Sequence, residues 1–211
     1  MTTTASIADP IQKSTCGDPK IFFRTAILDA KLTLTEKHAA MAANGYDAIA
    51  HAVETLVSTR RTPISECFSR EAWRLLDANF ERVLAEPEDM DARAAMLLGS
   101  HFAGTAVEYA ALGPAHACAQ PLADNFRLPH GVAVALVLRR AMEWLGEPVD
   151  RVRRLGYLAE AAGLPACLRD AAIPDHSLPR LAEEAAAQWA GRFSARPFDS
   201  AAALEIYRSA Y

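Results

Sequence analysis

The sequence lacks paired cysteines, a basic block and any long apolar run. Its four cysteines, Cys16, Cys67, Cys118 and Cys167, are widely spaced, so neither a disulfide framework nor a zinc knuckle is indicated. No run of Lys or Arg is interleaved with aromatic residues, and nucleic-acid binding is therefore not expected. The longest apolar run, residues 132–138, is too short to span a membrane.

The sequence also lacks two signals of location and cofactor binding. No basic segment followed by an apolar one opens the chain, so a secretory signal is not expected and a cytoplasmic location is the default. Neither a G-x-G-x-x-G nor a G-x-x-x-x-G-K motif is present, so no loop for nucleotide phosphates is identified. What is present is 211 residues, 51% of them apolar, with a net charge of −4, which is enough for one domain with a substantial core.

The first 35 residues differ from the rest of the chain. Residues 1–20 are polar, are interrupted by Pro10 and Gly17, and are expected to be poorly ordered. Residues 21–35 are rich in apolar and β-branched side chains with partial alternation, which predicts one or two short strands. So few strands cannot form a stable sheet alone, so we interpret them as the end of a sheet whose other strands are missing.

Residues 36–211 are expected to form an all-helical domain, because apolar residues recur there at helical spacing. Thr62 followed by Pro63 predicts a helix start, and Asp199 predicts the start of the last helix.

Residues 91–112 form a mostly apolar stretch that predicts a helix buried on nearly all sides. Gly99 and Gly104 in this stretch would permit close approach of a neighbouring helix. His101, in the same stretch, is interpreted as a hydrogen-bonded core or cleft-lining histidine rather than a ligand.

One carboxylate and three imidazoles occur in apolar, helix-like settings: Asp47, His51, His116 and His130. Burying such groups is costly unless something compensates, and a divalent metal ion would do so. Asp47 and His51 are four residues apart, so they lie on one helix face. Alone this pair is more often solvated, but the combined set suits Fe(II), Zn(II), Co(II) or Ni(II) rather than Ca(II) or Mg(II).

Other polar residues have simpler interpretations. Glu54 could orient His51 from the same helix face, or it could cap a surface, and both alternatives stay open. His38 and His176 lie in polar stretches and are expected at the surface. Cys118 is expected to pack rather than to coordinate.

Three ordered motifs resemble those of the iron-containing alcohol dehydrogenase family. They are GYDAIAHAVE at residues 45–54, GPAHACAQP at residues 113–121 and LPHG at residues 128–131. Residues 195–198 also resemble the closing segment of that family, and the resemblance runs from about Phe22 to the C-terminus.

The resemblance implies a mainly α fold, the helical-bundle C-terminal domain of the dehydroquinate synthase-like and iron-containing alcohol dehydrogenase fold, with a short N-terminal strand remnant. Residues 1–35 would then be a tail plus remnant strands of a missing nucleotide-binding domain. Residues 36–211 would be the metal-binding domain.

By the same resemblance, Asp47, His51, His116 and His130 carry over as four metal ligands. The implied cofactors are Fe(II), with Zn(II) as an alternative, and NAD or NADP. Gln120 departs from the pattern, because many members have a further histidine there, and glutamine cannot titrate in a proton relay. The retained Asp47 and His130 favour the metal-dependent branch over the related maleylacetate reductases.

The leading hypothesis is an alcohol dehydrogenase-like oxidoreductase that moves a hydride between a small alcohol or carbonyl compound and NAD(P). This chain would supply the metal site, and its partner would be a second copy of the chain or a separate nucleotide-binding polypeptide. The alternative is a metal-binding or dimerisation module without activity of its own. A lyase of the dehydroquinate synthase type would need basic residues near the metal, and Arg127 is the only nearby candidate.

Overall fold

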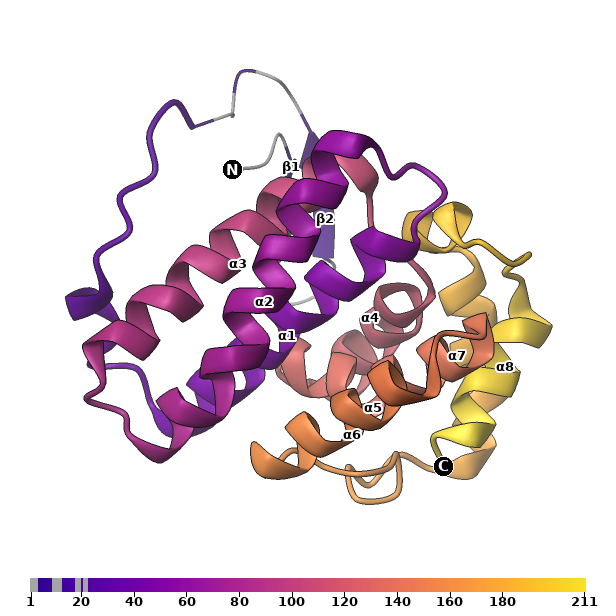
Figure 1. Ribbon diagram of the computed structural model, residues 1–211. Helices are drawn as coiled ribbons and strands as arrows, with labels where there is room; N and C mark the ends of the chain where they lie inside the picture. Colours follow the sequence, from indigo (N-terminus) through magenta and orange to yellow (C-terminus); the bar gives the residue numbers. More distant parts are fainter. Residues whose placement is uncertain (1–3, 9–12, 18–19, 21–22) are drawn as a thin grey trace.

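The computed structural model describes residues 4–8, 13–17, 20 and 23–211. Eight α-helices account for most of this part of the chain (Figure 1), and the mainly helical fold predicted from the sequence is confirmed. The helices are α1 (His38–Val57), α2 (Pro63–Ala85), α3 (Met90–Ala110), α4 (Pro114–Phe126), α5 (His130–Leu145), α6 (Val149–Ala161), α7 (Leu178–Ala186) and α8 (Ser200–Ser209). The shorter elements are the 3-10 helices η2 (Ala30–Thr33), η3 (Asp175–Ser177) and η4 (Trp189–Phe193) and the strands β1 (Thr4–Ala8) and β2 (Lys13–Gly17).

The helices form two groups that meet along α1. Helices α1, α2 and α3 pack against one another as three long helices, and α4 to α8 gather on the other side of α1 (Figure 1). Helix α1 also packs against α5, so it belongs to both groups. A side chain on α1 that faces the second group is therefore enclosed by segments far away in the sequence.

One continuous apolar core joins the two groups. Its largest members, Tyr46 and Tyr207, are fully buried, and each hydroxyl finds a backbone partner. The Tyr46 hydroxyl donates to the Leu155 carbonyl at 3.0 Å, and the Tyr207 hydroxyl donates to the Cys118 carbonyl at 2.6 Å. These bonds satisfy the polar ends of the two rings and tie α1 to α6 and α8 to α4. Among the helices described, none is long and apolar enough to cross a membrane.

Two helix starts predicted from the sequence are confirmed. The Thr62 hydroxyl accepts from the Ser65 amide at 3.1 Å, and the Ser65 hydroxyl accepts from the Thr62 amide at 2.8 Å, which forms a reciprocal cap on α2. The Asp199 carboxylate accepts from the Ala202 amide at 2.9 Å at the start of α8. Each bond satisfies an amide of the first turn, which has no partner within its own helix.

The strands predicted within residues 21–35 are wrong for residues 23–35, and residues 21 and 22 lie outside the described part. The Asp29 carboxylate accepts from the Lys31 amide at 3.0 Å and begins η2 instead. Arg93 of α3 then holds the end of η2 by donating to the Thr33 carbonyl at 2.7 Å. A stretch rich in apolar and β-branched residues forms a strand only beside a partner strand. No described strand pairs with residues 23–35. The only described strands, β1 and β2, pair with each other in antiparallel fashion earlier in the chain.

The same segment leaves large apolar side chains in solvent. Five large apolar residues between positions 23 and 34 are each more than two fifths exposed: Phe23, Ile27, Leu28, Leu32 and Leu34. We call this set the exposed apolar segment.

Helix α3 is less buried than its composition predicted. Leu98 and Tyr109 are 36% and 46% exposed, because α3 packs against α1, α2 and η2 on one side only. Gly99 does permit a close approach, since a Cβ atom there would lie 2.8 Å from the Cγ atom of Leu76. The packing role expected for Gly104 is wrong, because a Cβ atom there would meet no described atom within 4 Å.

Candidate metal centre

Helix α1 supplies the first two side chains of the centre. Asp47 and His51 are one turn apart on the side of α1 that faces the second helix group, and the Asp47 Oδ2 to His51 Nε2 distance is 3.9 Å. Both side chains are partly buried, with exposed fractions of 20% and 27%. The four-residue spacing seen in the sequence therefore does place the two groups on one face.

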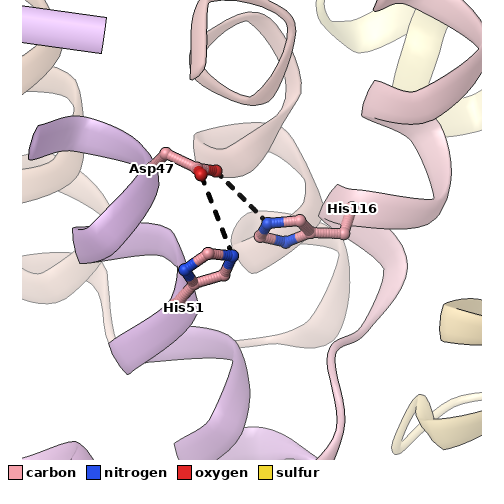
Figure 2. A group of neighbouring side chains, drawn as sticks. All are labelled: Asp47, His51 and His116. Carbon is pink, nitrogen blue, oxygen red and sulfur yellow. Dashed lines mark ion pairs between the residues drawn. The ribbon is translucent and has the colours of Figure 1, made fainter. Parts of the chain in front are cut away.

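The first turn of α4 brings His116 against this pair. Its Nε2 atom lies 3.3 Å from Asp47 Oδ1, and its ring stacks on the His51 ring with centroids 4.7 Å apart and planes 16° apart. Figure 2 shows the three side chains converging from α1 and α4, with both imidazoles directed at the carboxylate. His116 is only 5% exposed, so it forms the closed side of the cluster.

His130, at the start of α5, completes the set from a third element. Its Nε2 atom lies 3.7 Å from Asp47 Oδ1, and its ring centroid is 5.4 Å from that of His116. Gly131 makes this approach possible, because a Cβ atom at that position would lie 2.1 Å from the Ala43 carbonyl oxygen of α1. A glycine after His130 is thus what lets α5 begin in backbone contact with α1.

The structure brings together all four side chains that the sequence singled out, although their role as ligands stays a prediction. Ligand atoms of Asp47, His51 and His116 all lie within 4.8 Å of one another, a spacing that could hold a metal ion, and His130 lies against Asp47 just outside this group. One carboxylate with imidazoles is a donor set suited to Fe(II) or Zn(II).

Two buried atoms of the cluster indicate that the residues fit such an ion. Asp47 Oδ1 and His116 Nε2 are inaccessible to solvent, and neither forms a hydrogen bond within the part of the chain that the structure describes. Buried polar atoms are nearly always satisfied, so this pair calls for a group that both atoms could bind. A cation between them would satisfy both.

Glu54 has a different partner from the one considered in the sequence. It is fully buried, and its Oε2 atom lies 2.5 Å from His116 Nδ1 rather than against His51. Its Oε1 atom accepts from the Ala115 amide at 2.7 Å. The surface alternative for Glu54 is therefore wrong, and the histidine that it orients is His116.

The opposite charges of the cluster shift the pKa values of Asp47 and His116 toward their charged forms. Burial acts to raise the pKa of the Asp47 carboxyl, but the charge of His51 and the contacts from His116 and His130 outweigh it and hold that pKa well below its ordinary value. Burial acts to lower the pKa of His116, but Asp47 and Glu54 outweigh this effect and raise it to about 10. Burial lowers the pKa of His51 despite the neighbouring Asp47. Among the protein groups alone, a proton on His116 balances the buried carboxylates, and a cation could take its place.

His38, His176 and Cys118 lie where the sequence indicated. His38 and His176 are exposed. Cys118 is fully buried, and burial raises the pKa of its thiol. His101 is partly buried on α3, and its ring lies beside that of Phe102 with centroids 6.1 Å apart. Burial also lowers the pKa of His101.

Two other residues near the motifs are engaged or exposed. The Gln120 amide donates to both carboxylate oxygens of Asp124 at 2.8 Å, a contact within α4. Arg127 ends α4 in the left-handed region, with φ of 53°, and its side chain is exposed.

Together, the two helix groups and the four converging side chains define an all-helical domain with a carboxylate and imidazole centre between its halves. The chain belongs to the iron-containing alcohol dehydrogenase family: a sequence profile described as "Fe-containing alcohol dehydrogenase family, C-terminal" matches residues 41–155. That match runs from the first turn of α1 to the middle of α6, and it includes all four side chains of the centre.

Individual relatives extend this result. The chain is 29% identical to maleylacetate reductase 1 of Cupriavidus pinatubonensis over 86% of its length and 55% of that protein. It is 28% identical to 1,3-propanediol dehydrogenase of Citrobacter freundii over 88% of its length and 54% of that protein. A solved 1,3-propanediol oxidoreductase matches the whole chain with a TM-score of 0.94 and 25% identity, over 62% of that structure. The chain therefore spans about half the length of the curated relatives it matches.

Proposed function

We propose that this chain supplies the metal site of an oxidoreductase that moves a hydride between a small alcohol, aldehyde or ketone and NAD or NADP. The observation that carries the proposal is the pair of buried atoms, Asp47 Oδ1 and His116 Nε2, which lie 3.3 Å apart without a hydrogen bond in the described chain. Such a pair at the meeting point of α1, α4 and α5 is costly unless a proton or a cation lies between the two atoms, and a divalent cation would bind both.

Asp47, His51, His116 and His130 would hold the ion, with Fe(II) as the proposed metal and Zn(II) as the alternative. A bound divalent metal supplies Lewis acidity, which polarises an alcohol or carbonyl oxygen. Relatives named as dehydrogenases and reductases share the family, and this membership supports the choice of an alcohol or carbonyl substrate.

The protein side chains give the centre a closed side and an open side. His116 is 5% exposed and lies deepest, whereas His51 and His130 are 27% and 33% exposed. A small substrate would approach from the side of His51 and His130. Asp47 would supply the negative charge that balances the cation, because its carboxyl stays ionised.

Metal binding tests this proposal directly. We expect the purified chain, reconstituted anaerobically with Fe(II) or with Zn(II), to retain a stoichiometric amount of metal after desalting, as measured by elemental analysis. The His116→Ala variant should retain little. Equal and negligible metal in both proteins would remove the basis of the proposal.

The nucleotide would be bound by a different domain, either elsewhere in a longer polypeptide or in a separate chain. The relatives are nearly twice as long as the region matched here, and the exposed apolar segment presents five large side chains to solvent. Apolar side chains gathered on one segment favour a protein partner. We propose that a nucleotide-binding domain covers this segment, and light scattering with and without such a domain tests it. A stable homodimer formed through this segment would instead assign the segment to a second copy of the chain.

The exposed apolar segment also supports a second candidate function, a metal-binding or dimerisation module with no turnover of its own. Mixing the metal-loaded chain with an alcohol and NAD or NADP separates the two candidates. Steady production of reduced nicotinamide would exclude the inactive module. A metal-loaded chain that stays inactive until a nucleotide-binding domain is added would show that both parts are needed.

A further inference from the structure

Glu54 is a buried carboxylate that the proposed ligand set does not use. It follows His51 by three residues on α1, and none of its surface is exposed. An isolated carboxylate in such a place would strongly destabilise the fold, so its position requires strong partners. All of the hydrogen-bond partners that the structure gives it come from the first turn of α4.

The first contact is with the backbone of α4. Glu54 Oε1 accepts from the Ala115 amide at 2.7 Å, and Glu54 Oε2 lies 3.4 Å from the His116 amide. Gly113, at the N-cap position, has no side chain to accept these bonds, and Pro114 at the first helical position has no amide hydrogen. Glu54 therefore caps α4 from a different helix.

The second contact is with the His116 side chain. Glu54 Oε2 lies 2.5 Å from His116 Nδ1, on the opposite side of the ring from the Nε2 atom that faces Asp47. The same carboxylate already accepts from the Ala115 amide, so we assign the ring hydrogen to Nδ1, which donates it to Glu54. When the ring is neutral, Nε2 is then the nitrogen with a free lone pair.

Gly113 maintains this arrangement by leaving room for the carboxylate. A Cβ atom at position 113 would lie 2.9 Å from Glu54 Oε1. The glycine before α4 and the glutamate on α1 are therefore matched to each other, although they are far apart in the sequence.

We propose that Glu54 is a positioning residue for the metal centre: it fixes the orientation of His116 and the nitrogen that carries the hydrogen, so that Nε2 is available to bind the ion. The proposal rests on the proposed function, because it assigns His116 Nε2 as a ligand atom. When a carboxylate accepts from the second nitrogen of a ligating histidine, its substitution typically lowers metal affinity by about 10-fold to 100-fold.

The Glu54→Gln variant tests the proposal because it keeps the shape and reverses the hydrogen bond. Its amide oxygen can still accept from the Ala115 backbone, so α4 stays capped. Its amide nitrogen would face Nδ1 and donate to it, which favours the hydrogen on Nε2 and blocks that atom. We expect the affinity for Zn(II), measured by competition with a chromophoric chelator, to fall by about 10-fold to 100-fold.

Asp89→Asn is the matched control, because Asp89 caps α3 through the Asp91 and Ala92 amides and has no contact with the cluster in the described structure. We expect this variant to keep the wild-type Zn(II) affinity. If Glu54 served only as a helix cap, Glu54→Gln would behave like the control, and that result would overturn the proposal.

A spectroscopic measurement gives an independent readout. In the Zn(II)-loaded wild-type protein, proton NMR should show a downfield Nδ1 hydrogen of His116, assigned by its loss in His116→Ala. Glu54→Ala should lose this resonance, and its presence in that variant would contradict the proposal. A wild-type chain that binds no Zn(II) would contradict both the role of Glu54 and the proposed function. Equal Zn(II) affinity of wild type and Glu54→Gln would contradict only the role of Glu54.

Discussion

The metal centre and the exposed apolar segment depart from ordinary burial in opposite directions. The centre buries Glu54 and His116 and partly buries Asp47, whereas the segment exposes Phe23 and Ile27 by 71% and 84%. The buried groups are arranged by three helices to within hydrogen-bond or near-contact distances, and the exposed groups belong to residues 23–34, where the only regular element is η2. The comparison teaches that the helical domain encloses its polar centre with its own helices but leaves the exposed apolar segment before α1 uncovered.

The largest effect is expected at Asp47, the one described residue that contacts all three imidazoles. Asp47→Ala removes a proposed ligand and the charge that would balance the cation. We therefore expect Fe(II) and Zn(II) affinity to fall by more than about 100-fold, which exceeds the loss typical of a residue that only orients a ligand. Chelator competition measures it. Asp150→Ala is the control, because that side chain is 96% exposed. Similar affinities in the two variants would mean that the centre does not bind metal through Asp47.

The pH dependence of stability is the next largest expected effect. In the metal-free chain, Asp47 and Glu54 raise the pKa of His116 to about 10, above its ordinary value near 6.5. A raised pKa in the folded state stabilises the fold below the unfolded-state pKa and loses that contribution as the pH rises through the folded-state value. We therefore expect the unfolding free energy to fall between about pH 6.5 and pH 10, by an amount on the order of a few kcal/mol.

Chemical denaturation of the metal-free chain across this range measures the effect. The matched comparison is His116→Ala, in which the tyrosines, lysines and cysteines still titrate. The difference between the two proteins isolates His116, and a difference that does not change with pH would contradict the expectation.

Two glycines test whether close helix packing beside the centre matters for metal binding. Gly131→Ala would push α5 away from α1, because its Cβ atom meets the Ala43 carbonyl, and overpacking of this kind typically costs about 1–3 kcal/mol. Gly104→Ala meets no described atom within 4 Å and should instead stabilise α3 by about 0.5–1 kcal/mol. Thermal denaturation measures both. Metal affinity should fall in the first variant only, because only His130 depends on the close approach.

Sequence reasoning identified the side chains of the centre better than it identified their contacts. Helical spacing alone places Asp47 and His51 on one face of a helix, because both belong to α1. The partner of Glu54 could not be found in that way: spacing along α1 places Glu54 near His51, but the packing of α4 decides that its carboxylate meets His116. Residue type gives a local period, whereas a contact between two helices depends on how they pack.

The errors at the N-terminus and in α3 have a common cause. Residues 23–35 have the composition of a strand but no neighbouring strand, and residues 91–112 have the composition of a buried helix but only one covered side. Composition indicates what a segment would bury if a partner were present. In both places the described chain does not supply that partner, so Leu98 and Tyr109 remain exposed along with the N-terminal segment.

The smallest expected effect on stability lies in the exposed apolar segment itself. Ile27 is 84% exposed and does not belong to the apolar core, so Ile27→Asp should change the unfolding free energy by less than about 0.5 kcal/mol, as surface substitutions usually do. Its effect should appear instead in association, because a charge in a covered apolar interface must be desolvated without a partner. Equilibrium sedimentation should show weaker self-association, or weaker binding to a nucleotide-binding domain, at unchanged metal affinity. A loss of stability comparable to that of Gly131→Ala would show that Ile27 is buried within the isolated chain, and the contrast between an enclosed centre and an uncovered segment would fail.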